Sequence, residues 1–410
     1  MSKKIGDVMQ SKKIIIIGGG ASGMIAAISA RKSGALVTIL ERNQKLGKKI
    51  LATGNGRCNF TNVDATSNHY NHPQFVSTIF EQFSVDKTIS FFKELGIYPK
   101  IEDEGKTYPL SEQASSINML LEEELKRLGI TIILNAYVTH IEKKEETFFI
   151  TTQDEIYQAD RVVLSTGGKA LPQSGSDGNG YDIARSFGHQ LTHIFPSLVK
   201  LTLDSPHLKH LDGVKFKGTV ELYDHHHLLQ TEFSDILFTK YGISGPGILQ
   251  ISRKANEFLS LNKEIWIKLI LVNYIQKIDV IHQMKEMKDR QIKSFLTGLI
   301  HQKIIDVILK ETQIPKDKIL KDLNKDESRA LLNILFDWRF KVTGSKDFID
   351  AQVTAGGIKL DEVLPYTLES KLFKGLFFSG EILDIDALCG GYNLQWAWSS
   401  GYVAGFHAGK

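Results

Sequence analysis

Hydrophobic and polar positions near the start of the chain predict a strand, a helix and a second strand in close succession. Residues 14–17 are four consecutive isoleucines, the β-branched composition of a strand that is buried on both faces. Three glycines follow, and the segment 21–35 then has helical composition and ends around Gly34. A second apolar run covers residues 36–40. This order predicts a βαβ unit of about 30 residues.

Two later apolar runs predict further strands of the same sheet. Residues 160–168 read DRVVLSTGG and residues 372–384 read LFKGLFFSGEILD, and both runs end near glycine. The second run is followed by YNLQWAWSSGYVAGFHAG, which has helical composition. A dinucleotide-binding fold whose final strand and helix come this late must contain an insertion. We therefore predict an α/β fold with a discontinuous Rossmann-like domain over residues 1–195 and 351–410.

The insertion divides by the period of its pattern. Residues 196–280 alternate polar and apolar positions in short runs, as in TVELYD, and predict a β-rich inserted domain. Residues 281–350 change to helical spacing and predict a helical inserted domain. Within the helical part, Asn324 is placed as an N-cap with Glu327 three residues later. The pattern as a whole predicts three domains.

The glycines after the first strand match a dinucleotide-binding motif. Gly18, Gly20 and Gly23 satisfy GxGxxG, in which the first glycine turns the chain, the second admits a pyrophosphate and the third lets helix and strand pack closely. Amides at the helix start would face the diphosphate. Glu41 follows Gly18 by 23 positions, where a carboxylate accepts hydrogen bonds from a ribose and repels a 2′-phosphate. The motif favours FAD or NAD over NADP.

The loop after the βαβ unit favours FAD over NAD. Residues 41–62 read ERNQKLGKKILATGNGRCNFTN and supply many glycine amides together with the cations of Lys48, Lys49 and Arg57. A loop of this kind suits a longer ligand whose far end must also be wrapped. The alternative is a solvated basic loop with no ligand.

These segments resemble the bacterial YhiN/BaiN-like flavoproteins, also described as NAD(FAD)-utilising dehydrogenases or aminoacetone oxidase-like proteins, in the glutathione-reductase-type FAD superfamily. The resemblance covers nearly the whole chain and is most specific in GGGASG, GKKILATGNGRCNFTN, LFTKYGISGPGILQIS, VTAGGI and FFSGEILDIDALCGGYNLQWAWSSGYVAG. It implies an FAD domain built from both ends of the chain, with the backbone of Val138 meeting the adenine. It says less about the substrate.

The motifs and the resemblance together give the predicted cofactor-binding residues. They are Gly18, Gly20, Ala21, Ser22, Gly23, Glu41, Arg42, Lys48, Lys49, Gly54, Asn55, Val138, Thr166, Gly167, Gly168, Gly380, Glu381, Asp386, Gly391, Asn393 and Leu394. No metal site is expected, and no catalytic acid or base is assigned. Cys58 and Cys389 both lie in segments expected near the flavin, so a redox pair stays open, although small thiols suit such glycine-rich positions without any redox role.

FAD itself carries out hydride chemistry, so the protein must bind, orient and tune it. The C-terminal helix is expected to begin at residues 391–394 with its amides facing the pyrimidine edge of the flavin, where its positive end stabilises a reduced, anionic ring. No second GxGxxG follows a strand, so NAD(P)H would have to act as a transient electron donor at an open flavin site. We expect an FAD-dependent oxidoreductase for a small organic substrate, either a dehydrogenase or reductase, or an oxidase of an amine or aminoketone.

Composition and charge limit the partners and the cellular location that we expect for the protein. The 410 residues carry a formal net charge of +3 and two cysteines, which does not require nucleic acid as a partner and provides no disulfide framework. No apolar run approaches the ~18 residues of a membrane span and no secretory signal is evident. We expect a bacterial cytoplasmic protein that acts without nucleic acid or membrane. An FAD-dependent tRNA-modifying enzyme and a flavin-binding regulator without turnover remain alternatives, and the oligomeric state is open.

Overall fold

The structure, a computed structural model, describes residues 11–410, which form two compact units. The first unit comprises the chain through Ile194 together with Val353–Lys410, and the second comprises Phe195–Gln352. Each unit has its own hydrophobic core. Among the described residues, no helix is both long and apolar enough to span a membrane.

A five-stranded parallel sheet is the centre of the first unit. Its strands, in spatial order, are β19 (Leu376–Phe378), β10 (Arg161–Leu164), β1 (Lys13–Ile17), β2 (Leu36–Leu40) and β6 (Thr131–Ile133). The four isoleucines of β1 are at most 4% exposed because both faces of the sheet are covered. The predicted strand from the middle of the sequence, β10, therefore pairs with β1, and the predicted strand from the end, β19, pairs with β10.

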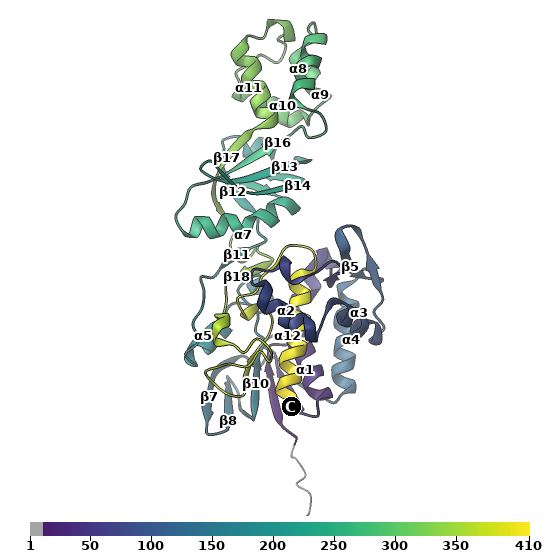
Figure 1. Cartoon of the computed structure of the whole chain (residues 1–410), viewed down its shortest axis with the longest axis vertical. Coiled ribbons are helices and arrows are strands. Elements are labelled where there is room, and N and C mark those ends of the chain that lie inside the picture. The colour runs from purple at the N-terminus through teal and green to yellow at the C-terminus, as the bar shows by residue number, and fades with distance from the viewer. Residues whose placement is uncertain (1–10) are drawn as a thin grey trace, which may run out of the picture. The chain divides into compact units, whose positions relative to one another are not determined.

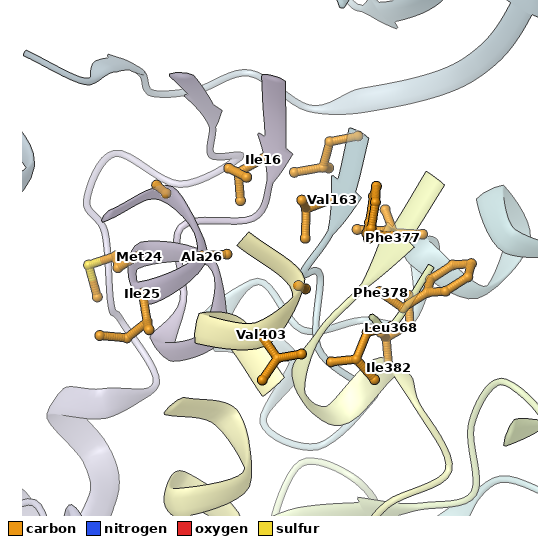
Figure 2. Close-up of a cluster of buried hydrophobic side chains, with 14 of the residues drawn as sticks. Ile16, Met24, Ile25, Ala26, Val163, Leu368, Phe377, Phe378, Ile382 and Val403 are labelled. Carbon is orange, nitrogen blue, oxygen red and sulfur yellow. The ribbon is translucent and has the colours of Figure 1, made fainter. Parts of the chain in front are cut away.

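Two helices from opposite ends of the chain pack closely against each other and the sheet. Helix α1 (Ala21–Lys32) and helix α12 (Tyr392–Gly409) touch through glycines of α12, since a Cβ on Gly401 would lie 2.3 Å from the Ser22 carbonyl oxygen and one on Gly405 would lie 2.1 Å from that of Ala26. Figure 2 shows Met24 and Ala26 of α1, Val403 of α12 and Phe377 of β19 in one apolar cluster. This packing joins the two parts of the discontinuous unit.

Smaller elements complete the first unit around this sheet (Figure 1). An antiparallel meander contains β7 (Val138–Lys144), β8 (Thr147–Thr152) and β9 (Ile156–Ala159), and a second small sheet contains β3 (Thr61–Asn62), β5 (Lys106–Pro109) and β4 (Pro99–Ile101). The remaining α-helices of the unit are α2 (Pro73–Gln82), α3 (Val85–Glu94), α4 (Ala114–Arg127) and α5 (Asn179–Ser186), and its remaining strand is β18 (Val353–Ala355).

The second unit is built on a closed six-stranded barrel. Its strands, in spatial order, are β12 (Leu201–Asp204), β15 (Gly242–Ser244), β14 (His227–Thr239), β13 (Lys215–Asp224), β16 (Ile265–Ile270) and β17 (Trp338–Ser345). Its remaining elements are β11 (Phe195–Ser197), α6 (Leu208–Leu211), α7 (Pro246–Ser260), α8 (Lys277–Glu286), α9 (Ile292–Thr297), α10 (Gln302–Glu311) and α11 (Lys325–Phe336). Asn324 caps α11 with Glu327 as the spacing predicts.

The inserted segment departs in two respects from the expected β-rich and helical domains at 196–280 and 281–350. Strand β17 lies inside the range expected to be helical, and it pairs with both β12 and β16 to close the barrel. Its residues alternate between buried and more exposed positions, which is the period of a strand. Barrel and helices also share one hydrophobic core, so they form a single compact unit.

Candidate functional site

A cleft of about 910 Å³ opens at the carboxyl ends of the parallel strands of the first unit. Ile17, Leu40 and Ser165, which end or follow β1, β2 and β10, all line it. In open parallel sheets this is the edge where ligands bind, because the strand-to-helix turns gather there. The lining also includes the loop 47–50 and the C-terminal residues Glu381 and Leu394.

The three motif glycines have different physical roles. Gly18 has φ +98° and a Cβ there would lie 2.6 Å from the Ser165 carbonyl oxygen, while a Cβ on Gly23 would lie 1.9 Å from the Gly18 carbonyl oxygen. Both are required by packing. Gly20 has φ −80° and no protein atom within 4 Å of an added Cβ, so the fold does not require glycine there. Since Gly20 lines the cleft, its missing side chain leaves room for a ligand.

Helix α1 presents its first turn to the same cleft. Ala21 and Ser22 line it, no side chain caps the helix, and no acidic residue lies in the first turn. The first-turn amides of a helix have no intrahelical acceptor, and its N-terminus carries about half a unit of positive charge. This arrangement suits the diphosphate of a dinucleotide.

The Glu41 carboxylate is fixed by its neighbours at the end of β2. Its Oε2 accepts from the Gly19 amide at 2.7 Å, and its Oε1 accepts from the backbone and side-chain nitrogens of Asn43 at 2.8 and 2.7 Å. A carboxylate has about four acceptor positions, so one remains for a ligand hydroxyl. Glu41 lines the cleft, and its contact with a ribose stays a prediction.

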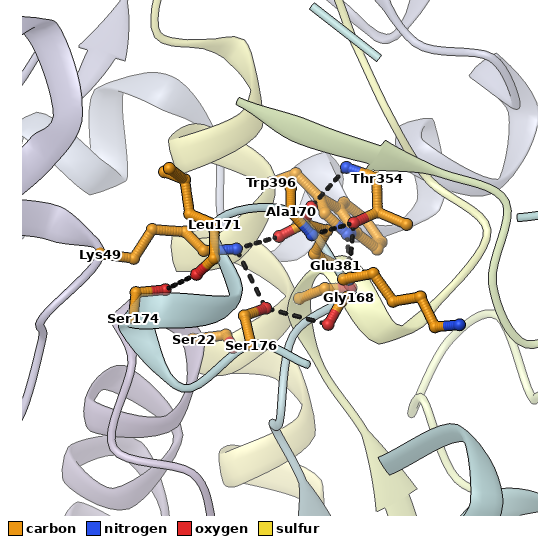
Figure 3. A network of polar contacts seen from close by, with 12 residues as sticks. Ser22, Lys49, Gly168, Ala170, Leu171, Ser174, Ser176, Thr354, Glu381 and Trp396 are labelled. Carbon is orange, nitrogen blue, oxygen red and sulfur yellow. Dashed lines mark hydrogen bonds and ion pairs between the residues drawn. The ribbon is translucent and has the colours of Figure 1, made fainter. Parts of the chain in front are cut away.

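Lys49 and Glu381 meet across 332 residues of sequence (Figure 3). The Lys49 Nζ lies 2.9 Å from Glu381 Oε2 and donates to Ser176 Oγ at 3.1 Å. The other carboxylate oxygen of Glu381 accepts from the Thr354 amide at 2.6 Å. Both charged side chains remain 20–25% exposed in the cleft lining. They place one cation and one acceptor where a ligand can reach them.

Thr166 supplies a further polar group in the cleft. Its Oγ1 is buried and has no hydrogen-bond partner among the described residues, although a buried polar atom left unpaired costs about 1–3 kcal/mol. Thr166 and Gly167 both line the cleft. A ligand with polar groups along its length would satisfy this hydroxyl.

The adenine end of the predicted site is lined by residues 136–138, with Val138 at the start of β7. Arg42 also lines the cleft; its guanidinium lies 4.5 Å from the Tyr137 ring centre and pairs with Asp177 at 2.5 Å. Lys48 is an exposed cation of the lining. These residues line the cleft, and their contact with the cofactor stays a prediction.

Eight of the predicted residues lie outside the cleft lining: Gly23, Gly54, Asn55, Gly168, Gly380, Asp386, Gly391 and Asn393. Gly391 caps α12 with φ +98°, and a Cβ there would lie 2.4 Å from the Thr61 carbonyl oxygen. The Asn393 side chain bonds to the backbone of Ala387 and Leu388 and does not cap α12. Within this cleft, α12 contributes Leu394 alone.

The reasons for the other outlying positions are also local. Gly54 and Asn55 both adopt left-handed backbone conformations in a tight turn, with φ +56° and +55°. A Cβ on Gly168 would lie 2.3 Å from Thr354 Oγ1. A Cβ on Gly380 would lie 2.5 Å from Ser22 Oγ, and Asp386 is 1% exposed. Turn geometry and packing account for these residues, and any contact with the cofactor stays a prediction.

Several lining residues have no counterpart among the predicted ones: Gly19, Asn43, Gly47, Thr53, Ser174, Gly175, Ser176 and Asn179. Asn43 follows Glu41 by two positions, so its side chain could have been suspected of orienting that carboxylate. The serines at 174 and 176 occupy an irregular loop whose sequence shows no period. They could be placed only once the fold brought that loop to Lys49.

Neither cysteine has the environment of a redox thiol. Cys58 is 0% exposed, and burial raises the pKa of its thiol to about 12. Burial also raises the pKa of the Cys389 thiol. A thiol that stays protonated is a poor nucleophile.

Comparison with known proteins identifies the family. The model of the HI0933-like protein Rossmann domain matches residues 12–407. The chain belongs to this HI0933-like family. It is 38% identical over 401 residues to the 3-dehydro-bile acid delta(4,6)-reductase of Clostridium scindens, covering 96% of this chain and 98% of that protein. It is 31% identical over 403 residues to the ribosomal RNA dihydrouridine synthase of Haemophilus influenzae, covering 96% and 98%.

Solved structures show the same fold. An open conformation of a flavocytochrome c3 fumarate reductase matches with a TM-score of 0.51 at 17% identity, over 98% of this chain and 78% of that one. The 3-ketosteroid delta1-dehydrogenase of Sterolibacterium denitrificans matches with a TM-score of 0.52 at 11% identity, over 97% and 100%. The predicted family, the Rossmann-type FAD-binding fold, FAD as the cofactor and the class of FAD-dependent oxidoreductases are confirmed.

Proposed function

We propose that this HI0933-like protein is a cytoplasmic FAD-dependent reductase of carbon–carbon double bonds conjugated to a carbonyl group. The cleft, with its unobstructed Gly20 and uncapped α1, supports FAD as the resident cofactor. The names of the relatives support the reaction. A delta(4,6) unsaturated 3-oxo ring and the uracil ring that becomes dihydrouridine both hold a double bond in conjugation with a carbonyl.

The chain's own residues hold the cofactor in this proposal. FAD, when bound, supplies hydride chemistry at its ring. The first turn of α1 would hold the diphosphate, and Glu41, fixed by Gly19 and Asn43, would orient the adenosine ribose. Lys49 would turn its ammonium toward the diphosphate, while Glu381 would accept hydrogen bonds from cofactor hydroxyls. These contacts orient a flexible ligand before the substrate arrives.

A small unsaturated ketone is the substrate class that we favour, with NAD(P)H as the transient electron donor. The 38% identity to the bile acid reductase supports this choice over the amine or aminoketone oxidation that the sequence left open. The absence of a second GxGxxG after a strand fits a donor that binds only briefly.

Uracil within RNA is the second candidate substrate. Two relatives at 31% identity, from Haemophilus influenzae and Escherichia coli, are named ribosomal RNA dihydrouridine synthases. The expectation that no nucleic acid binds was based only on the small net charge of the whole chain.

An anaerobic half-reaction experiment tests the reductase proposal. The flavin of the purified protein is first reduced with NADH or NADPH and then mixed with a 3-oxo-4-ene steroid, with a uridine-containing RNA, or with the saturated 3-oxo steroid as the matched control. We expect an unsaturated compound to restore the oxidised flavin absorbance and to gain two hydrogens by mass spectrometry. Reoxidation by oxygen alone, together with flavin reduction by amines, would instead favour an oxidase.

A further inference from the structure

A second hollow, of about 1110 Å³, lies in the barrel-containing unit. Its wall is formed by residues 215–217 at the start of β13, residues 271–275 after β16, residues 297–301 from the last residue of α9 onward, and Ile304 of α10. We call this hollow the barrel groove. All of its lining belongs to the second unit, and the cleft of the first unit shares no residue with it.

The charges of the barrel groove are cationic. Lys215 and Lys217 line it, and no Asp or Glu does. Lys215 pairs with Asp235 at 2.8 Å. Lys217 has no carboxylate partner among the described residues, and its ammonium lies 5.3 Å from the centre of the Phe233 ring. The groove therefore presents an unneutralised cation beside an aromatic face.

Two aromatic side chains stand in solvent at this groove. Tyr274 is 78% exposed and Phe233 is 46% exposed, and their rings meet edge to face with centres 6.1 Å apart. Tyr274 belongs to the lining. Large exposed aromatic surfaces lose the stabilisation of burial, so their presence beside lysines indicates a partner with flat rings and negative charge.

The charge of the whole chain conceals a difference between the units. Residues 195–352 contain 24 Lys and Arg against 20 Asp and Glu, while the rest of the chain contains 26 against 27. The positive excess therefore belongs to the unit with the barrel groove. The net charge of +3 is too coarse a measure to exclude a polyanion from one face of one unit.

We propose that the barrel groove binds single-stranded RNA, with bases stacked on Tyr274 and Phe233 and the backbone phosphates near Lys217. Proteins bind single strands by this combination of aromatic platforms and cations, whereas the bases of a duplex are not free to stack. Thr297 and His301 provide groups for the 2′-hydroxyl: His301 Nδ1 accepts from the Lys303 amide, and Nε2 has no partner among the described residues. The proposal goes beyond the reductase activity, because the barrel groove shares no residue with the cleft. RNA binding to the groove can also be measured without turnover.

Fluorescence anisotropy of a labelled 12-nucleotide oligouridine, titrated with the oxidised full-length holoprotein at 50 and 200 mM salt, tests the assignment. We expect Tyr274→Ala to weaken binding by about fivefold or more, the lower end of what one base-stacking contact contributes, and Tyr274→Phe to retain it. Lys217→Gln should weaken binding at both salt concentrations and reduce the salt dependence by about one phosphate contact.

Matched controls separate the groove from general effects. Tyr98→Ala removes an aromatic ring that is 61% exposed in the first unit, and Lys285→Gln removes an exposed lysine of α8; both should bind like the wild type. Thermal melting and flavin content verify that each variant is folded. Wild-type protein that does not bind the oligouridine at 50 mM salt, or Tyr274→Ala that binds as the wild type does, overturns the proposal. Equal affinity for the oligodeoxythymidine of the same length overturns the assignment to RNA.

Discussion

At the residue scale, the same amino acid serves packing in one position and ligand access in another. Gly23 is surrounded by backbone and Gly20 is not, although both belong to one motif. A sequence match cannot separate the two roles, because the difference depends on which atoms the fold places around each Cα. The structure distinguishes the two roles, so substitutions at the two glycines are expected to have different measurable effects.

Gly20→Ala and Gly23→Ala should therefore fail in different ways. The first adds a methyl group to the cleft where no protein atom lies within 4 Å, so we expect weaker FAD binding with nearly unchanged stability of the apoprotein. The second places a methyl group 1.9 Å from the Gly18 carbonyl oxygen and should destabilise the apoprotein by about 1–3 kcal/mol. FAD titration and urea denaturation measure the two effects. Equal loss of stability in both variants would contradict this division.

The ion pair of Lys49 and Glu381 predicts a second contrast at this scale. We expect Lys49→Met to weaken FAD binding about tenfold or more, because a charge-assisted hydrogen bond contributes about 1.5–3 kcal/mol. Apoprotein stability should change by less than about 1 kcal/mol, since the pair is partly exposed to solvent. Lys45→Met, an exposed lysine outside the cleft lining, is the control for FAD titration. Normal FAD affinity in Lys49→Met would remove Lys49 from the site.

His189 gives a residue whose protonation is coupled to stability. Its side chain is 0% exposed and lies 3.0 Å from Glu362 and 2.8 Å from Ser370, and burial lowers its pKa below the usual 6.5 despite the carboxylate. The folded state thus binds the proton less tightly than the unfolded state. The contribution of neutral His189 to the stability of the fold is therefore present above about pH 6.5 and is lost as the pH falls.

Urea denaturation at pH 7.5 and 5.5 checks this linkage. Wild-type stability should fall toward pH 5.5, and His189→Gln should show a smaller fall, whatever its stability at pH 7.5. His226→Gln, on the exposed β13–β14 turn, should retain the wild-type dependence. A pH dependence in His189→Gln equal to that of the wild type would assign the effect to other groups.

At the element scale, the local pattern of apolar and polar residues was sufficient to predict the main strands and helices of the first unit. The isoleucine strand, the helix after it and the late strand and helix of the first unit all lie where their patterns placed them. Strand β17 was missed because its alternating run follows a helical stretch, and the partners that make it a barrel strand lie far away in sequence. The contact of Lys49 with Glu381 was missed for the same reason, since no local pattern encodes a meeting across 332 residues.

The contact between α1 and α12 predicts an unusual response to a helix-favouring substitution. Alanine inside a helix is about 1 kcal/mol more favourable than glycine, yet a methyl group on Gly405 would lie 2.1 Å from the Ala26 carbonyl oxygen. We expect Gly405→Ala to lower the free energy of unfolding by about 1–3 kcal/mol. Gly298→Ala, at the end of α9, should have little effect, because the added Cβ would lie 3.6 Å from the Phe295 carbonyl oxygen. Stabilisation by Gly405→Ala would show that the two helices can separate at little cost.

At the scale of the whole molecule, the chain builds two hydrophobic cores with different tasks. The cleft draws all of its lining from the first unit, and the barrel groove draws all of its lining from the second. The sequence predicted an interrupted domain because its final strand and helix come late in the chain, and the first unit takes its sheet from both parts of the chain. It could not indicate that barrel and helices share one core, since that depends on side-chain packing between distant segments.

Two cores predict two responses to the cofactor. In the proposed site FAD contacts only the first unit, so a free FAD concentration of 100 times Kd should add about 2.7 kcal/mol to the stability of that unit alone. Scanning calorimetry should then show two unfolding transitions, of which one moves to higher temperature with FAD. Phe238→Leu, in the core of the second unit, should lower the other transition and leave the FAD-dependent one in place. A single transition that moves as a whole in both experiments would mean that the two cores unfold cooperatively. The two units would then have no separate free energies of unfolding.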